Sequence, residues 1–120
     1  MSSFIYLMEF DMETPMLSRR SVPTSLKIDS TMIKVGKVQH PRPFEDRMKD
    51  YRGTYKCLKC NKSHFSVIKK WELSEKHDPN TIEKTIGEEF YNEKINVRCE
   101  YYKNSAKRKI LNRINELLTK

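Results

Sequence analysis

Residues 57–60 read Cys57-Leu58-Lys59-Cys60, and the fold that the sequence predicts is built around this stretch. Two cysteines separated by two residues can bend around one ion, because zinc prefers four thiolate or imidazole ligands in a tetrahedron. The chain holds only one other cysteine, Cys99, so its three thiols cannot all pair as disulfides. In a reducing compartment this spacing favours a metal or redox site over a disulfide framework.

A structural Zn²⁺ ion needs two further ligands. Cys99 is the expected third ligand, because Ile95 to Tyr101 alternate between apolar and polar residues and predict a strand beside the cysteine pair. The expected fourth ligand is His77, with His64 as the close alternative and His40 as a weaker one. Two other interpretations stay open: reduced core cysteines without a metal, and the redox pair of a thiol oxidoreductase.

The stretch Tyr55-Lys56-Cys57-x-x-Cys60, followed by Phe65, Leu73 and His77, resembles the first half of a two-cysteine, two-histidine zinc finger. The sequence departs from that pattern, because the usual gap of twelve residues ends at Leu73 and no second histidine follows His77. The resemblance implies an irregular module of the zinc-finger or zinc-ribbon kind that binds nucleic acid.

The charge balance favours a polyanionic partner. The 120 residues include 24 Lys and Arg against 16 Asp and Glu, which gives a formal net charge of +8. Residues 1–50 hold 8 basic and 7 acidic side chains, so most of the excess belongs to residues 51–120. Nucleic acid is the expected partner, and the second half of the chain is expected to bind it.

Two stretches lack acidic residues, one around the cysteine pair and one at the start of the last predicted helix. If Cys99 meets the pair, these stretches become neighbours and form one surface that neutralises several phosphates. Tyr102 is expected to be exposed, as a platform on which a base can stack. The predicted nucleic-acid-binding residues are Arg52, Lys56, Lys59, Lys62, Lys69, Lys70, Tyr102, Lys103, Lys107, Arg108, Lys109 and Arg113.

The predicted fold is α+β: a small zinc-stapled antiparallel sheet, a C-terminal amphipathic helix and an extended N-terminal arm. Residues 1–43 form the arm, with short strands at Phe4–Phe10, Leu26–Ile28 and Met32–Val38, because prolines disfavour long helices there. Residues 44–120 form the zinc-binding domain.

Three helices are expected in that domain. The first runs from Phe44 to Tyr51, and the second runs to about Glu89 with Asn80 as its cap. The third follows the cap candidates Asn104 and Ser105, and its apolar residues recur at helical spacing: Ile110, Leu111, Ile114, Leu117 and Leu118. Between the first two helices, alternating Phe65, Val67, Trp71 and Leu73 predict a strand.

The sequence favours a non-catalytic, zinc-organised accessory protein that binds DNA or RNA in transcription, replication or RNA processing. It contains no Gly-rich phosphate loop, no His-Glu-x-x-His motif and no nucleophile elbow, so no enzyme is expected. The alternatives are a protein-interaction subunit of a polymerase or ribosome, which docks through the N-terminal arm, and a thiol oxidoreductase.

No apolar run approaches the roughly 18–20 residues of a membrane span. The apolar stretch from Phe4 to Met8 has no basic region before it and is followed by acidic residues, which is atypical of a secretory signal. We therefore expect an intracellular protein of the nucleus or cytoplasm with no membrane partner.

Overall fold

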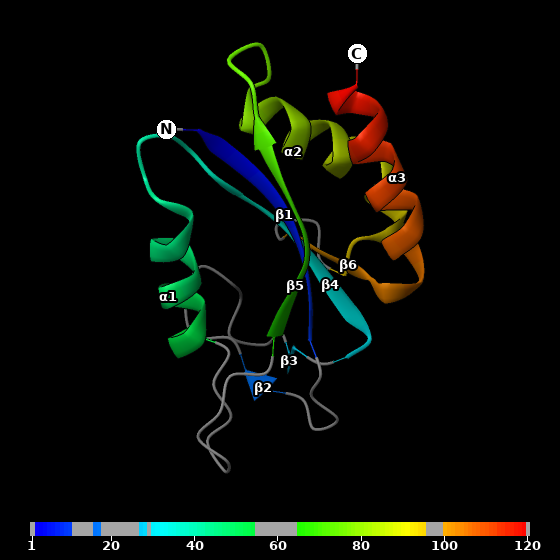
Figure 1. The fold of residues 1–120 in the computed structure, drawn as a ribbon. Coiled ribbons are helices and arrows are strands. Elements are labelled where there is room, and N and C mark those ends of the chain that lie inside the picture. Colours follow the sequence, from blue (N-terminus) through cyan, green and yellow to red (C-terminus); the bar gives the residue numbers. More distant parts are fainter. Residues whose placement is uncertain are drawn as a thin grey trace.

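The computed structural model describes residues 2–10, 16–17, 27–28, 30–54, 65–95 and 100–119. Within them the fold is α+β, with a four-stranded antiparallel sheet of order β5-β1-β4-β6 (Figure 1). Its strands are β1 (Ser3–Phe10), β4 (Met32–Val38), β5 (Phe65–Leu73) and β6 (Tyr101–Lys103), and β2 (Met16–Leu17) pairs separately with β3 (Lys27–Ile28). The expected α+β class, antiparallel sheet and C-terminal helix are confirmed.

The two central strands come from the region in which an N-terminal arm was expected. Ile5, Tyr6, Leu7 and Met8 are completely buried, because β1 pairs with β4 on one side and β5 on the other and is covered on both faces. The arm that was expected to be extended is therefore part of the sheet: Ser3–Phe10 and Met32–Val38 form its two middle strands. An apolar run in a strand that is buried on both faces lacks the alternation that marks an ordinary antiparallel strand.

Helix α1 (Phe44–Thr54) packs on one face of the sheet, and α2 (Pro79–Glu89) and α3 (Lys107–Leu118) pack on the other (Figure 1). Successive side chains of a strand point to opposite faces, so β1 contributes to two cores. The core on the α1 face is Tyr6, Met8, Phe10, Met32, Val38, Met48, Tyr51 and Tyr101. The core on the other face includes Ile5, Leu7, Ile33, Val35, Trp71, Ile82, Ile86, Ile110 and Ile114.

The helix starts differ from the sequence expectation. Asp78 is the N-cap of α2, since its side chain accepts a hydrogen bond from the backbone N–H of Asn80 at 2.9 Å and Pro79 occupies the first turn. Asn80 is therefore inside the helix and is not its cap. Residues Asn104–Ala106 form a short 3-10 turn, η2, and α3 begins after it with no side-chain cap.

The last predicted strand is shorter than expected within the described residues. β6 covers only Tyr101–Lys103, and Lys94, after the 3-10 turn η1 (Tyr91–Glu93), forms an isolated bridge with Tyr102. Residues 96–99 of the prediction lie outside the described residues. Both Tyr101 and Tyr102 are buried, because β6 is covered on both faces.

Across the described ranges, no helix combines the length and the apolar character that a membrane crossing requires.

The ring of Tyr6 lies directly over Gly36, its cross-strand partner in β4. A methyl group at residue 36 would lie 2.6 Å from Tyr6 Cε2 and closer still to the hydroxyl, and the fully buried ring has no room to move. We expect Gly36→Ala to lower the free energy of unfolding by about 2 kcal/mol or more, measured by urea denaturation.

Gly87→Ala in α2 is the matched control. Its new methyl group would meet the flexible Lys94 ammonium at 3.2 Å, and alanine favours a helix interior by about 0.5–1 kcal/mol over glycine. This variant should be as stable as the parent or slightly more so. Equal stability of Gly36→Ala and the parent would contradict the close packing of Tyr6 on β4.

Candidate nucleic-acid interface

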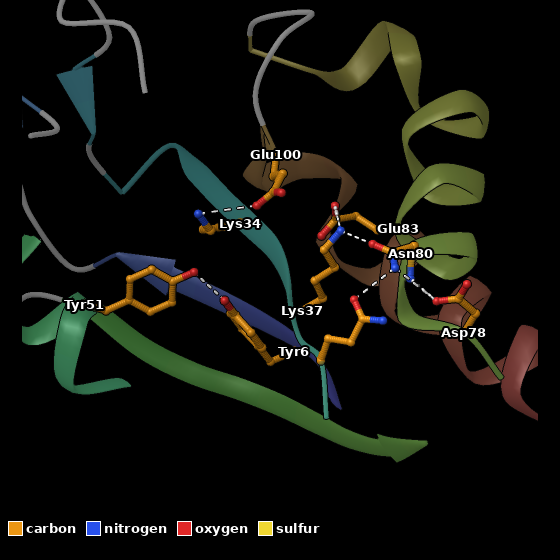
Figure 2. Close-up of polar contacts among 9 residues, drawn as sticks. Tyr6, Lys34, Lys37, Tyr51, Asp78, Asn80, Glu83 and Glu100 are labelled. Carbon is orange, nitrogen blue, oxygen red and sulfur yellow. Dashed lines mark hydrogen bonds and ion pairs between the residues drawn. The ribbon is translucent and has the colours of Figure 1, made fainter. Parts of the chain in front are cut away.

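Five polar side chains gather on the α1 face of the sheet. Tyr6 comes from β1, Lys34 from β4, Arg47 and Tyr51 from α1, and Glu100 from the residue before β6. We call this group the tyrosine–lysine cluster. Figure 2 shows the hydroxyl groups of Tyr6 and Tyr51 pointing toward one another and Lys34 pointing toward Glu100.

The two tyrosines form the buried part of the cluster. Their hydroxyl groups are hydrogen bonded to each other, and Arg47 Nε donates to Tyr51 Oη at 3.0 Å. Burial, followed by the neighbouring Tyr51 hydroxyl, raises the pKa of Tyr6 far above its ordinary value. Tyr6 therefore keeps its proton at neutral pH and acts as a hydrogen-bond donor or acceptor, not as a base.

Two cations pack against these rings. Lys34 Nζ lies 5.1 Å from the ring centres of both Tyr51 and Tyr101, and the Arg47 guanidinium lies 5.1 Å from that of Tyr51. Lys34 is only 5% exposed and forms an ion pair with Glu100 at 3.4 Å, whereas the Glu100 side chain is 38% exposed. Arg47 is half-buried, so its planar fork of N–H donors can reach an anion at the surface.

A second polar group joins β4 to α2, and we call it the Lys37 junction. Lys37 Nζ lies 3.6 Å from Glu83 Oε1 and donates to Asn80 Oδ1, while Asn80 Nδ2 donates to Gln39 Oε1 at 3.1 Å (Figure 2). Burial, followed by the nearby Glu100 carboxylate, raises the pKa of Glu83 to about 7. Glu100 thus connects the Lys37 junction to the tyrosine–lysine cluster.

The described residues contain no group of three or more His, Cys, Asp or Glu side chains suited to a metal ion. His77 and His40 line one cavity of about 420 Å³ at the end of the sheet, and His77 Nε2 is buried there with no hydrogen-bond partner among the described atoms. Cys57, Cys60, Cys99 and His64 lie outside the described residues, so the zinc ion stays a prediction.

The family model of the T5orf172 domain matches residues 4–118. The chain belongs to the T5orf172 domain family. No curated protein and no solved structure matches it. Membership in the T5orf172 family indicates a nucleic-acid-related function.

The zinc-finger or zinc-ribbon resemblance is wrong. The T5orf172 match extends from β1 to the end of α3, whereas the resemblance rested on about 23 residues around the cysteine pair. In this chain the central strands β1 and β4, which precede the cysteines, hold the described elements together.

The predicted basic residues are spread over several elements. Lys56, Lys59 and Lys62 lie outside the described residues. Lys107 is paired with Glu9 at 3.2 Å, and Arg113 with Glu89 at 2.8 Å, so part of the expected positive charge is neutralised. Arg52 on α1 is exposed and lies 3.9 Å from Glu45. The other described members are also exposed: Lys69 and Lys70 on β5, Lys103 at the end of β6, and Arg108 and Lys109 on α3.

The two predicted basic stretches meet only in part. Trp71 Nε1 donates to Asn115 Oδ1 at 2.7 Å, which places β5 against α3, and Lys69 lies over the Trp71 ring on that same face. Lys70 instead lies 4.5 Å from the ring centre of Phe44 in α1, on the opposite face. The single continuous surface is therefore divided between the two faces of the sheet.

Tyr102 is not the exposed platform that the sequence predicted. It is 2% exposed and packs in the core beneath α2 and α3. The alternation of its strand assigns Tyr101 and Tyr102 to opposite faces correctly, but helices cover both faces, so neither ring is available for stacking.

The tyrosine–lysine cluster itself was missed by sequence reasoning. One signal was present: Met32-Ile33-Lys34-Val35-Gly36-Lys37-Val38 places two lysines and a glycine in an otherwise apolar strand. A buried lysine in such a strand requires a partner, because an uncompensated buried charge is strongly destabilising. The partner, Glu100, lies 66 positions later in the chain, which no local pattern identifies.

Stability should depend on the protonation of Glu83. Its pKa of about 7 in the folded chain exceeds the ordinary value of 4.5, so between these values the folded state binds a proton that the unfolded state has released. Its contribution therefore destabilises the fold as the pH rises from about 5 to 8. We expect Glu83→Gln to raise the melting temperature, relative to the parent, by more at pH 8 than at pH 5.

Glu88→Gln, an exposed position on the same helix, is the control and should give the same small difference at both pH values. A Glu83→Gln effect that is equal at pH 5 and pH 8 would refute the raised pKa.

Proposed function

We propose that this chain binds DNA and that Arg47, in the tyrosine–lysine cluster, contacts the phosphate backbone. The observation that carries the proposal is that Lys34 and Arg47, from two different elements, converge on the ring of Tyr51. A T5orf172 domain is a DNA-binding and endonuclease-like domain, which favours DNA over RNA. The net charge of +8 supports a polyanionic partner.

The position of the Arg47 guanidinium is suited to binding a phosphate group. The Tyr51 hydroxyl accepts from Arg47 Nε, which orients the half-buried guanidinium so that it can contact phosphate oxygens at the surface. Lys34 is too buried to reach DNA directly, and Glu100 at 3.4 Å offsets its charge, so Arg47 supplies the contact. The exposed Lys70, which lies against α1 on the same face of the sheet, is suited to a further backbone contact without reading sequence.

Arg47→Ala should weaken binding to a short DNA duplex about tenfold or more, because it removes a charge-assisted contact, and fluorescence anisotropy would measure the change. Arg47→Lys should recover only part of the loss, since an ammonium lacks the planar fork. Arg52→Ala, on the exposed side of α1 and 3.9 Å from Glu45, is the matched control and should cost less than about threefold.

Melting temperatures would show that all three variants remain folded. Equal losses for Arg47→Ala and Arg52→Ala would argue against the tyrosine–lysine cluster, and tighter binding to RNA than to DNA would reverse the choice of nucleic acid.

A second candidate function is cleavage of the bound DNA. It is favoured by a guanidinium and a carboxylate in one cluster, Arg47 and Glu100, which are groups that can bind and polarise a phosphodiester. The Tyr6 hydroxyl is completely buried and would act through its hydrogen bond to Tyr51. Hydrolysis would form a bond from water oxygen to phosphorus and break the bond to a sugar oxygen, which takes up a proton. The alternative is that the domain binds nucleic acid without cleaving it, as an accessory of transcription, replication or RNA processing.

Nicking of supercoiled plasmid DNA, with Mg²⁺ or Mn²⁺ supplied, separates these two candidates. If the chain cleaves DNA, Tyr6→Phe should reduce the nicking rate at least about tenfold while binding persists, because only the hydroxyl is lost. Absence of nicking by the parent protein, with DNA binding intact, would support the non-catalytic function.

A further inference from the structure

We propose that the cavity at the end of the sheet binds an unpaired DNA base, with guanine preferred. This role rests on the proposed function, since the base belongs to a strand that Arg47 holds. It adds a base-binding site that lies outside the tyrosine–lysine cluster. The side chains that would contact the base are those of Ser3, His40, Glu75 and His77, all of which line the cavity.

The cavity, of about 420 Å³, lies where three neighbouring strands end. β1 begins at Ser3 and runs antiparallel to β4 and β5, so those two strands end at the same edge of the sheet. The segment after β4 supplies His40, and the turn between β5 and α2 supplies Ser74, Glu75 and His77. Figure 1 shows the N-terminus and both connecting segments at this end of the sheet.

Hydrogen bonds hold the walls of the cavity in place. The backbone N–H of His40 donates to Ser3 Oγ at 2.9 Å, which ties the segment after β4 to the start of β1. The backbone N–H of His77 donates to the Ser74 carbonyl at 3.0 Å, which closes the turn after β5. Leu73, which is buried, adds an apolar wall. The site is therefore largely preformed, which lowers the entropic cost of binding a ligand.

The polar groups of the cavity keep hydrogen-bonding capacity for a ligand. Ser3 Oγ accepts from His40, and its own proton is not donated to any described residue. The exposed Glu75 carboxylate has no partner in the described part of the chain, and His77 Nε2 has none there either. Donors and acceptors thus lie side by side, as they do along the edge of a nucleobase.

A base fits this lining better than a phosphate does. No described lysine or arginine lines the cavity, and the Glu75 carboxylate would repel a phosphate. A carboxylate instead accepts from N–H groups, and guanine offers two adjacent N–H donors on its pairing edge, whereas thymine offers one. The flat imidazole rings of His40 and His77 can stack on a base.

The cavity lies close to the strand that Arg47 would hold. α1 begins at Phe44, four residues after His40, and Arg47 follows Phe44 by three residues, which is about one helical turn of 5.4 Å. The cavity is therefore just beyond the N-terminal end of the helix that carries the phosphate contact. A paired base would have to leave the duplex to enter it. An unpaired base has no pairing to lose and is the expected occupant.

The test compares the full chain on three duplexes: fully paired, with one unpaired deoxyguanosine, and with one unpaired thymidine. Fluorescence anisotropy at fixed pH and salt gives the dissociation constants. The parent should bind the unpaired-deoxyguanosine duplex about fivefold or more tighter than either of the others. Glu75→Gln should lose this preference, whereas Glu88→Gln, the same change at an exposed position of α2, should keep it. Both variants remove one negative charge, so the long-range attraction to DNA changes equally.

A second readout uses no duplex. Deoxyguanosine added to the ¹⁵N-labelled chain should shift the amide signals of Ser3, His40, Ser74 and Glu75, and thymidine should leave them in place. Equal affinity of the parent for all three duplexes, with no shifts from deoxyguanosine, would overturn the base site while leaving DNA binding intact. If no duplex binds but deoxyguanosine shifts these signals, the proposed function fails and the base site stands.

Discussion

The close approach of the Tyr6 ring to Gly36 is the constraint on which the rest of the described structure depends. Gly36 in β4 has no side chain, so the fully buried ring of Tyr6 in β1 can lie against this strand. This position brings the Tyr6 hydroxyl to Tyr51 and so attaches α1 to the sheet. Because α1 also carries Arg47, the packing of the two central strands places a guanidinium and a buried lysine against the same Tyr51 ring.

Sequence reasoning predicted the elements better than their arrangement. The strand Met32–Val38 was placed at its observed bounds, and the last helix was identified because its apolar residues recur at helical spacing. Strand order was missed, since alternation tells which face a residue occupies but not which strand lies next to it. The cysteine pair drew attention to the middle of the chain, whereas the central strand of the sheet, in which Ile5–Met8 are completely buried, lies near its start.

The candidate site could not be predicted because its members are far apart in the sequence. Its members lie at positions 6, 34, 47, 51 and 100, and only the fold brings them together. The count of basic residues assigned the excess positive charge to the second half of the chain. In the structure, however, Lys107 forms an ion pair with Glu9, and Arg113 forms one with Glu89. Among the described residues, the most deeply buried cation is Lys34, which belongs to the half that looked electrically balanced. Which basic side chains could hold a phosphate depends on whether an acidic side chain already lies next to them. The number of basic residues in a stretch of sequence does not show this.

The most direct test of this account is an NMR titration of the ¹⁵N-labelled chain with a short DNA duplex. We expect the largest chemical-shift changes on α1 around Arg47 and Tyr51 and on β4 around Lys34. Changes confined to Arg108 and Lys109 at the start of α3, with α1 unaffected, would contradict it and move the DNA-binding surface to the other face of the sheet.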